Sequence, residues 1–540
     1  MNFIETFPDG YFPRPQQRDA LDGIGAGWKK TKFVICNAPT GVGKTAIAKA
    51  IANSSKDISD SHKELIRCYD AYNIDYTKGG YAYHDEFMQA PKASTIALTI
   101  TKSLQDQYTR EFKDIARYKG KSNYLCDIDE ELSVDIGPCV YVAGQRDECW
   151  MQNRCPYFEA RNEALTAKFT ALNYNLYLTL PEHLKQREFL ICDEASEIED
   201  ILVNQYSFEI NYKVIKFALG MAFSKIPRSN KQAQIKWLIE LTANLDNTID
   251  AIKKRLSKSD QKEQNLMQRL TAARKVMESV DKVIGAWKDN EYLLDNNGTN
   301  DVLTPLRVNR FADDLFKDAK YVLLMSATIV DHEQFARTLG IDDYEYVEVP
   351  SPFDANKSPI YAGKLTLNHK TLESTLPTVV NHIKVLAASH PNDKGVIHTH
   401  TNKITKYLQD HLGDTDRFIF REPGVTNEDI LEAHEESTGP SVLVSPSLTH
   451  GVDLKGELAR WQIIIKLPYL PLGSVRIKAL FDKDKKWYTN KMMSNLIQAS
   501  GRGTRSTDDW CVTYIFDANF ARVMQQSKAD VPSYFLDRVQ

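Results

Sequence analysis

The most constraining feature of this sequence is a glycine-rich turn between an apolar segment and a helix-like one. Residues 33–36 form the apolar segment, and residues 44–52 are rich in alanine and isoleucine. The turn reads Ala38-Pro39-Thr40-Gly41-Val42-Gly43-Lys44-Thr45. A strand, a glycine loop and a helix in this order form a P-loop, in which backbone N–H groups and the helix N-terminus hold phosphates.

The residue types in this loop indicate an ATP site that also contains Mg²⁺. We expect Lys44 to reach the β- and γ-phosphates and the Thr45 hydroxyl to join the Mg²⁺ shell. The cofactor-binding residues predicted here are Thr40, Gly41, Val42, Gly43, Lys44 and Thr45.

A second apolar segment supplies the acids that such a site requires. Residues 189–192 are apolar and are followed directly by Asp193 and Glu194. At the end of a buried strand, Asp193 would bind Mg²⁺ and Glu194 would polarise the attacking water. Upstream, the Gln17 amide could bond both edges of adenine, although a polar surface turn is an equal alternative for residues 13–17.

Two later segments add candidates for the same site. Residues 321–325 form an apolar strand that leads into Ser326-Ala327-Thr328. Residues 498–505 form a glycine turn with arginines at 502 and 505. Guanidinium groups beside a γ-phosphate stabilise transition-state charge, and surface salt bridges are the alternative interpretation of these two arginines.

Taken in order, the motifs resemble the XPD/DinG branch of superfamily 2 helicases. Shorter matches to the branch occur at residues 173–178, 351–353 and 466–469. The motifs that carry the resemblance are Arg14-x-x-Gln17, the Gly-Lys-Thr loop, residues 98–107, Asp193-Glu194-Ala195-Ser196, Ser326-Ala327-Thr328, residues 447–456 and Gln498-x-x-Gly501-Arg502-x-x-Arg505.

The resemblance implies an α/β fold with two RecA-like motor domains, whose parallel sheets are flanked by helices. It places an iron–sulfur insertion and an all-helical arch insertion in the first motor domain. The implied boundaries are 1–115, 169–203 and 315–352 for motor domain 1, 116–168 for the iron–sulfur domain, 204–314 for the arch and 353–540 for motor domain 2.

The resemblance also assigns further residues to roles. Gly451 and Asp453 would bind nucleotide, and Thr101, Lys102 and Asn173 would contact DNA. The implied catalytic residues are Lys44, Asp193, Glu194, Gln498, Arg502 and Arg505. The sequence departs from the branch at Ser196, where a histidine is usual and where coupling to neighbouring motifs is expected to differ, and at residues 447–450.

Four cysteines fall within a short stretch with the pattern Cys126-x12-Cys139-x9-Cys149-x5-Cys155. Four thiolates suit either Zn²⁺ or an iron–sulfur cluster. Structural zinc sites usually contain a close cysteine pair, which this pattern lacks. The position of the cysteines in the resemblance favours a structural 4Fe-4S cluster; zinc and unligated thiols remain the alternatives.

Between residues 200 and 314, leucine, isoleucine, alanine and lysine recur at helical spacing, and this pattern predicts the helices of the arch. Residues 253–262 contain a basic stretch, which is equally consistent with a solvated helix face and with guiding a DNA strand.

The combined expectation is an ATP-dependent DNA helicase that moves 5′→3′ on single-stranded DNA and unwinds duplex; the polarity follows from the resemblance. Its partners would be single-stranded DNA and forked or tailed duplex DNA, and the protein would act as a monomer. Two alternatives remain: a translocase that remodels protein–DNA complexes, and a zinc-stapled scaffold that uses ATP as a switch. The motifs are compatible with DNA repair and with DNA replication.

Composition limits the expected cellular location of the protein and the kind of surface that could bind DNA. No run of 18 apolar residues occurs, so no membrane span is expected. The N-terminus has no basic segment followed by an apolar one, which favours the cytoplasm; a nucleoid-associated or a virus-encoded protein fits equally. The formal net charge is −4, so any basic track for DNA must be local.

Overall fold

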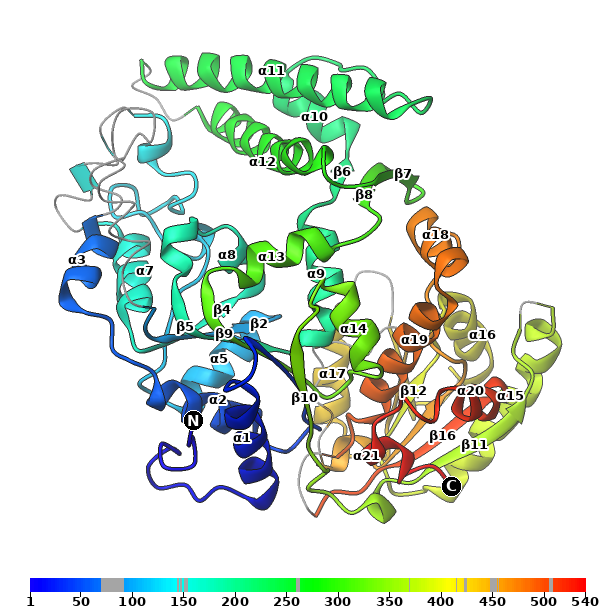
Figure 1. Cartoon of the computed structure of the whole chain (residues 1–540). Helices are drawn as coiled ribbons and strands as arrows, with labels where there is room; N and C mark the ends of the chain where they lie inside the picture. The colour runs from blue at the N-terminus through cyan, green and yellow to red at the C-terminus, as the bar shows by residue number, and fades with distance from the viewer. Residues whose placement is uncertain are drawn as a thin grey trace.

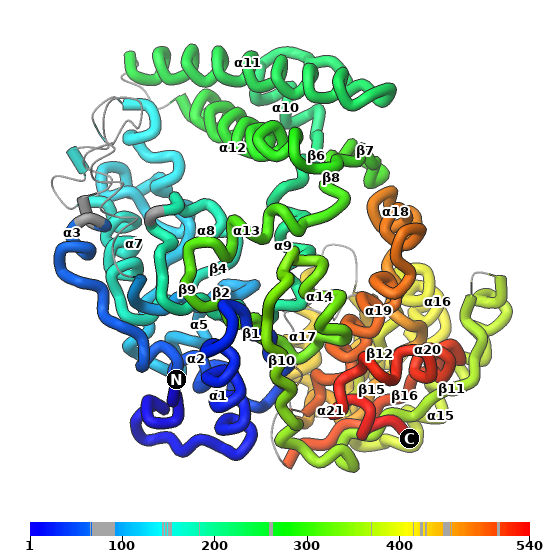
Figure 2. The backbone as a smooth tube through the Cα atoms, in the orientation of Figure 1, coloured from blue at the N-terminus to red at the C-terminus, as the bar shows by residue number. Residues whose placement is uncertain are grey.

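The computed structural model has two α/β domains side by side, beneath a pair of long helices that pack on each other (Figure 1). It describes the chain except for residues 69–91, 143–144, 146–147, 150–153, 259–262, 369, 414, 422–424, 447–453, 455 and 505–507. The two chain ends lie in different domains, as the tube in Figure 2 shows.

The first α/β domain, which corresponds to the expected motor domain 1 and keeps that name, is built on a parallel sheet with the strand order β10-β1-β9-β5-β2-β4-β3. Its central strands are buried on both faces, as expected for a parallel sheet between two helical layers. The strands are β1 (Phe33–Asn37), β2 (Thr95–Thr99), β3 (Ala116–Arg117), β4 (Phe169–Asn173), β5 (Arg187–Asp193), β9 (Ala319–Ser326) and β10 (Tyr344–Glu348).

Strand register brings three sequence motifs to one edge of this sheet. Asn37 of β1 pairs with Ser326 of β9, and Asp193 of β5 pairs with Met325 of β9. The P-loop, the acidic pair and the Ser-Ala-Thr motif therefore meet at the carboxyl ends of adjacent strands, where open α/β sheets bind ligands. The helices of this domain are α1 (Pro15–Gly27), α2 (Lys44–Ser54), α3 (Asp60–Cys68), α5 (Lys102–Glu111), α8 (Tyr174–Leu178), α9 (Ile198–Gln205), α13 (Asn309–Phe316) and α14 (His332–Thr338).

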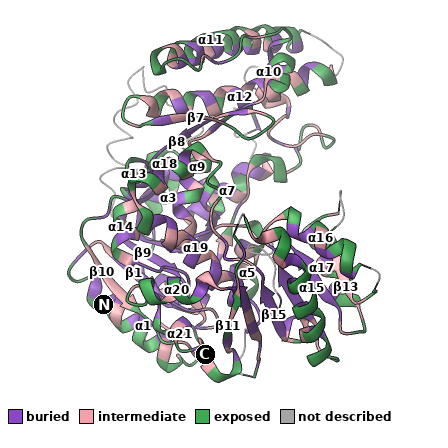
Figure 3. Cartoon of the chain, turned by 90° about the vertical axis from the view of Figure 1, so that its right-hand side faces the viewer, coloured by how far each residue is buried: buried purple, intermediate pink, exposed green. Residues whose placement is uncertain are grey.

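The second motor domain contains another parallel sheet, with the order β11-β16-β15-β12-β14-β13. In Figure 3 its strands are mostly buried between exposed helix faces. Two parallel sheets flanked by helices confirm the predicted fold class. The elements are β11 (Ile360–Leu365), α15 (Leu372–Ser389), β12 (Gly395–His398), α16 (Asn402–Leu412), β13 (Phe418–Phe420), α17 (Asn427–Glu436), β14 (Val442–Ser445), β15 (Trp461–Ile464), α18 (Val475–Lys483), α19 (Lys485–Ser500), β16 (Val512–Asp517), α20 (Asn519–Ser527) and α21 (Ser533–Leu536).

The arch contains the predicted helices α10 (Tyr212–Leu219), α11 (Lys231–Leu256) and α12 (Gln264–Trp287). Buried residues of α11 recur at three- and four-residue spacing, among them Leu238, Leu241 and Leu245. The expectation of an all-helical insertion needs one correction. A three-stranded antiparallel sheet forms the base of the arch, from β6 (Phe208–Ile210), β7 (Tyr292–Asn296) and β8 (Asp301–Pro305).

The segment that carries the four cysteines has little regular structure. It contains the 3-10 turns at Lys121–Asn123 and Pro138–Val140 and the helix α7 (Pro156–Thr166). A single bridge pairs Leu125 with Ser133, and Tyr124, Tyr157 and Phe158 pack edge to face on one another. These aromatic contacts anchor the segment to the core of the first motor domain.

Candidate active site

The P-loop adopts a conformation that two of its glycines make possible. Gly41 and Gly43 have φ values of 82° and 87°, in the left-handed region where a Cβ atom is disfavoured. A Cβ on Gly41 would lie 2.0 Å from Cζ of Phe353, and one on Gly43 would lie 2.6 Å from Nε2 of Gln17. Both positions are therefore closed to larger residues by backbone shape and by neighbouring side chains.

Lys44, at the start of α2, lies between the two acids that the sequence assigns to the same site. Its Nζ atom is 2.6 Å from Glu194 Oε1 and 3.7 Å from Asp193 Oδ1. All three side chains are largely buried, with 13%, 21% and 9% exposure for Lys44, Glu194 and Asp193. Charges this close and this poorly hydrated interact strongly.

Asp193 has a further polar partner that sequence reasoning missed. The hydroxyl of Tyr108, from α5, donates to Asp193 Oδ2 at 3.1 Å. Burial raises the pKa of Asp193, the nearby Lys44 opposes that rise, and Glu194 adds to it. A Mg²⁺ ion would favour the ionised carboxylate in the same way as Lys44 does.

The backbone at Glu194 is left-handed, with φ of 52°, and this turn aims the acid back toward the P-loop. Glu194 then connects to the Ser-Ala-Thr motif, because Ser326 Oγ donates to Glu194 Oε2 at 3.3 Å. Ser196 joins the same network: its hydroxyl lies 3.0 Å from the Ser326 hydroxyl and accepts from Thr328 Oγ1 at 2.8 Å. The serine that departs from the resembling branch therefore still contacts the neighbouring motif.

The second motor domain closes the opposite side of a cleft of about 730 Å³. Gln498 is in the last turn of α19, and Gly501, Arg502 and Thr504 follow the helix end; all four line the cleft. The structure thus brings Lys44, the two acids, Gln498 and Arg502 around one cavity. A volume of this size is typical of sites for small-molecule ligands such as nucleotides.

Three of the sequence candidates, Gly451, Asp453 and Arg505, lie outside the described residues. Their assignment stays a prediction.

Gln17 and the three proposed DNA contacts lie in definite local structures. The Gln17 amide is buried, and its Oε1 accepts from the backbone N–H of Arg14 at 2.9 Å. Thr101 caps α5 by accepting from Leu104 N, and it also lines the cleft. Lys102 Nζ donates to Asn123 Oδ1 at 2.7 Å, and Asn173 Nδ2 donates to the Ile100 carbonyl at 2.7 Å.

Several cleft residues had no role assigned to them from the sequence. Phe353 packs over the P-loop, and Arg14 Nη1 donates to the Gly41 carbonyl at 2.9 Å. From α21, the Tyr534 hydroxyl donates to the Ala327 carbonyl, so the second motor domain touches the Ser-Ala-Thr motif directly. Phe353 and Arg14 belong to segments that the sequence comparison had marked, whereas nothing in the local sequence singles out Tyr534.

The four cysteines line one small cavity. Its walls include Cys126, Cys139, Cys149 and Cys155, together with Phe158 and Arg154. Arg154 Nε donates to Asp127 Oδ2 at 2.7 Å and so ties together the chain segments beside Cys126 and Cys155.

The environment of these thiols is partly desolvated. Burial raises the pKa of the Cys139 thiol, and the neighbouring thiols of Cys126 and Cys155 raise it further. A Cβ on Gly137 would lie 3.0 Å from the Cys126 sulfur, so the chain approaches this sulfur closely. Within the part of the chain that the structure describes, no three His, Cys, Asp or Glu side chains form a group that could hold one metal ion. The thiols share a cavity without forming a single-ion site.

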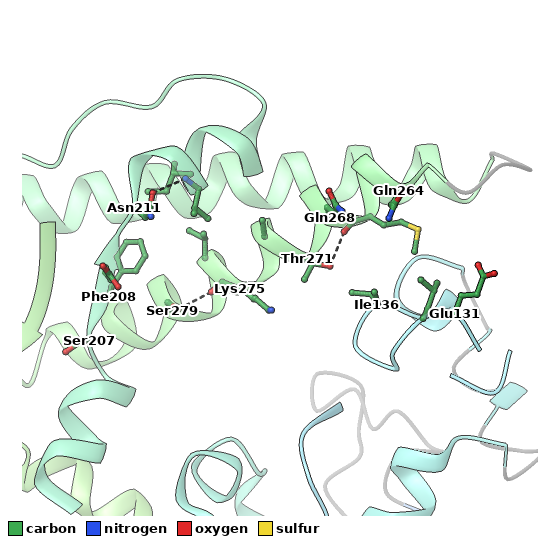
Figure 4. Close-up of a pocket in the computed structure, with 17 residues that line it drawn as sticks. Glu131, Ile136, Ser207, Phe208, Asn211, Gln264, Gln268, Thr271, Lys275 and Ser279 are labelled. Carbon is green, nitrogen blue, oxygen red and sulfur yellow. Dashed lines mark hydrogen bonds between the residues drawn. The ribbon is translucent and has the colours of Figure 1, made fainter. Parts of the chain in front are cut away.

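A second large cavity, of about 1010 Å³, separates the arch from the cysteine segment. Figure 4 shows Glu131 and Ile136 of the cysteine segment across from Gln264, Gln268 and Thr271 of α12. Its lining mixes amide and hydroxyl groups with apolar side chains and includes Lys275. The lining also includes the carboxylates of Glu131 and Glu209.

Comparison with known proteins supports an ATP-dependent helicase. A model of the helicase C-terminal domain family matches residues 397–535. A probable ATP-dependent helicase of Methanocaldococcus jannaschii is 21% identical, over 97% of this chain and 94% of the relative. The ATP-dependent DNA helicase YoaA of Escherichia coli is 21% identical, over 94% of this chain and 92% of the relative.

Solved structures agree on the fold. An XPD helicase structure aligns with a TM-score of 0.64 at 14% identity, covering 98% of this chain and 99% of that chain. A structure of Xpd4 from S. tokodaii aligns with a TM-score of 0.57 at 14% identity, over 98% and 99% of the two chains. The chain resembles XPD/DinG-type superfamily 2 helicases along its whole length. No helix in the described ranges is long and apolar enough to cross a membrane.

Proposed function

We propose that this protein is a DNA helicase that hydrolyses ATP in the cleft between its motor domains and moves 5′→3′ along single-stranded DNA. The observation that carries the proposal is the position of Lys44, held between Asp193 and Glu194 and facing Arg502 across the cleft. A phosphate-binding lysine, two acids and an arginine from a second domain are the groups that phosphoryl transfer requires.

ATP binding would rearrange the contacts of Lys44. The β- and γ-phosphates would compete with Glu194 for the Lys44 ammonium, which lies 2.6 Å from that acid. Transfer of Lys44 to the phosphates would free Glu194 to orient the attacking water. Asp193 and Thr45 would hold Mg²⁺, which would offset charge on the phosphates. Arg502, with Arg505, then stabilises the charge that develops on the γ-phosphate.

The 5′→3′ polarity and the DNA substrate rest on the resemblance to the XPD/DinG branch, and the cavity between the arch and the cysteine segment is the proposed path of the strand. The cavity's amide and hydroxyl groups are available for hydrogen bonds to a strand, and Lys275 supplies a cation. Thr101, Lys102 and Asn173 lie at the ends of β2 and β4 and are proposed to contact the DNA backbone, so binding should depend weakly on sequence.

We also propose that Cys126, Cys139, Cys149 and Cys155 hold a structural 4Fe-4S cluster. Four soft thiols around one partly buried cavity fit the donor set of such a group, which supplies rigidity when bound. The chain's own contribution is to shield the thiols with Phe158 and to fix the loops through the pair of Arg154 and Asp127.

Two measurements test these proposals. ATP turnover should be faster in the presence of single-stranded DNA than in its absence. Strand separation should require a 5′ single-stranded tail on the duplex. Failure to separate a tailed duplex, combined with efficient displacement of a bound protein, would favour the translocase instead. Metal analysis of protein purified without oxygen should find iron and sulfide; zinc in their place would favour the zinc-stapled alternative.

A further inference from the structure

A buried ion cluster lies outside the cleft, at the contact between the two motor domains. Its centre is Glu199 in α9, whose carboxylate accepts from Arg476 Nη2 at 2.7 Å and from Trp487 Nε1 at 3.1 Å. Lys491 Nζ is also 3.1 Å from Glu199. The side chains of Glu199 and Arg476 are only 7% and 6% exposed, so this pair is shielded from water.

The cluster connects the helix that follows the acidic pair with the helix that precedes Arg502. On the first motor domain, α9 begins at Ile198, a single 3-10 turn after the acidic pair at 193 and 194. On the second, Lys491 is in α19 two helical turns before Gln498, so both residues lie on one face of the helix. The same helix ends two residues before Arg502. A cluster that holds α9 to α19 therefore couples the position of the acids to the position of the arginine.

Arg476 also reaches a third body, the base of the arch. Its Nε atom donates to the Pro305 carbonyl at the end of β8, at 3.1 Å. The neighbouring backbone N–H of Val475 donates to Asp295 Oδ2 in β7 at 2.8 Å. Figures 1 and 2 both show α18 directly beside β7 at the foot of the arch. The Arg476 guanidinium thus connects α9, the base of the arch and the second motor domain.

The electrostatics of the cluster make it a stiff connection. Burial alone would raise the pKa of Glu199, but Lys491 and Arg476 lower it to about 2. Breaking a buried ion pair leaves an uncompensated charge, so the contact should persist while exposed pairs exchange. The pair of Lys478 and Asp482 on α18 is of the exposed kind, with 52% and 54% exposure.

We propose that Glu199 and Arg476 are positioning residues that transmit the nucleotide state of the cleft to the base of the arch. The inference rests on the proposed ATP-driven function and adds the route by which the motor moves the arch. The alternative is that this ion pair only stabilises the contact between the domains. In that case its loss would lower stability, and the arch would respond to nucleotide as before.

The test compares Arg476→Lys with Arg476→Gln in the full-length protein and uses Lys478→Gln as the matched control on the same helix. Lysine keeps the charge opposite Glu199. Its single ammonium cannot replace the Nε and Nη2 atoms of arginine, which donate separately to the Pro305 carbonyl and to Glu199. Amide hydrogen exchange of β7 and β8 is followed before and after addition of a non-hydrolysable ATP analogue, and ATP turnover and strand separation are measured in parallel.

We expect the ATP analogue to change the rate of amide hydrogen exchange in β7 and β8 by about tenfold, both in the unaltered protein and in Lys478→Gln. Both Arg476 variants should lose this change while analogue affinity stays within about twofold, and strand separation per ATP should fall by about tenfold. An arch response that survives in both variants overturns the proposal. So does a response lost only in proportion to thermal stability, which identifies Arg476 as a purely stabilising residue.

These outcomes are separable from a failure of the proposed function. Unaltered protein that hydrolyses ATP without DNA stimulation would contradict the DNA helicase proposal. The exchange experiment needs nucleotide alone, so in that case it still supports or overturns the connection between the cleft and the arch.

Discussion

Replacing Lys44 with methionine should destabilise the nucleotide-free protein in a pH-dependent way. Methionine keeps the apolar stem and removes the cation that lies 3.7 Å from Asp193 and 2.6 Å from Glu194. For the longer distance, Coulomb's law gives about 1 kcal/mol at the dielectric constant of water and about 4 kcal/mol at an effective value of about 20. With exposures of 13% and 9%, the true value should lie between these limits.

The sign of the pH dependence follows from the pKa of Asp193. Burial and Glu194 already raise this pKa above 3.8, and loss of Lys44 raises it further. The folded state then binds a proton more tightly than the unfolded state, so stability decreases as pH rises from 3.8 to the folded pKa and stays low above it. The variant should therefore be weakest near neutral pH and recover toward acidic pH.

Calorimetric or fluorescence melting without nucleotide or Mg²⁺ measures this effect. For a domain of this size, about 1 kcal/mol corresponds to about 2–4 °C, so we expect the first transition of Lys44→Met to fall by about 5 °C at about pH 8. The difference should shrink as the pH approaches about 4.

The matched control is Lys49→Met on the same helix. Its partner Asp114 is 70% exposed, so this substitution should give no such pH dependence. The reasoning is refuted if Lys44→Met melts at or above the unaltered protein at about pH 8, or if the gap widens in acid.

Three further substitutions test other parts of the site. Gly41→Ala should abolish nucleotide binding and cost about 1–2 kcal/mol in melting, because its Cβ would collide with Phe353 and its φ is 82°. Ser196→Ala should leave analogue affinity unchanged and lower ATP turnover several-fold, since it removes hydroxyl bonds to Ser326 and to Thr328; equal turnover would contradict a coupling role. Cys155→Ser should eliminate bound iron, measured by elemental analysis, and should leave the affinity for an ATP analogue unchanged. Full iron content in this variant would contradict the assignment of Cys155 as a ligand.

The parts of the site that the sequence predicted are those encoded locally. Gly41, Gly43 and Lys44 form a loop whose chemistry depends on adjacent residues, and the apolar strand before Asp193 is visible in the same way. Strand order is not encoded locally, but the parallel fold places all such strand ends at one edge of the sheet. The ends of β1, β5 and β9 therefore meet, with Asn37 beside Ser326 and Asp193 beside Met325.

The residues that the sequence did not reveal act across long distances in the chain. Glu199 and Arg476 are 277 positions apart, and each alone looks like an ordinary charged helix residue. Tyr534 contacts Ala327 from 207 positions away. The base of the arch was missed for a different reason. Its strands are short, β6 has only three residues, and they flank a long stretch with helical periodicity.

The most direct test of the account is strand separation on two matched duplexes, one with a 5′ single-stranded tail and one with a 3′ tail. We expect ATP-dependent unwinding of the 5′-tailed duplex, little unwinding of the 3′-tailed one, and loss of both DNA-stimulated turnover and unwinding in Lys44→Met. Unwinding that proceeds in Lys44→Met, or a 5′-tailed duplex that stays paired while ATP turnover ignores DNA, would contradict the central claim.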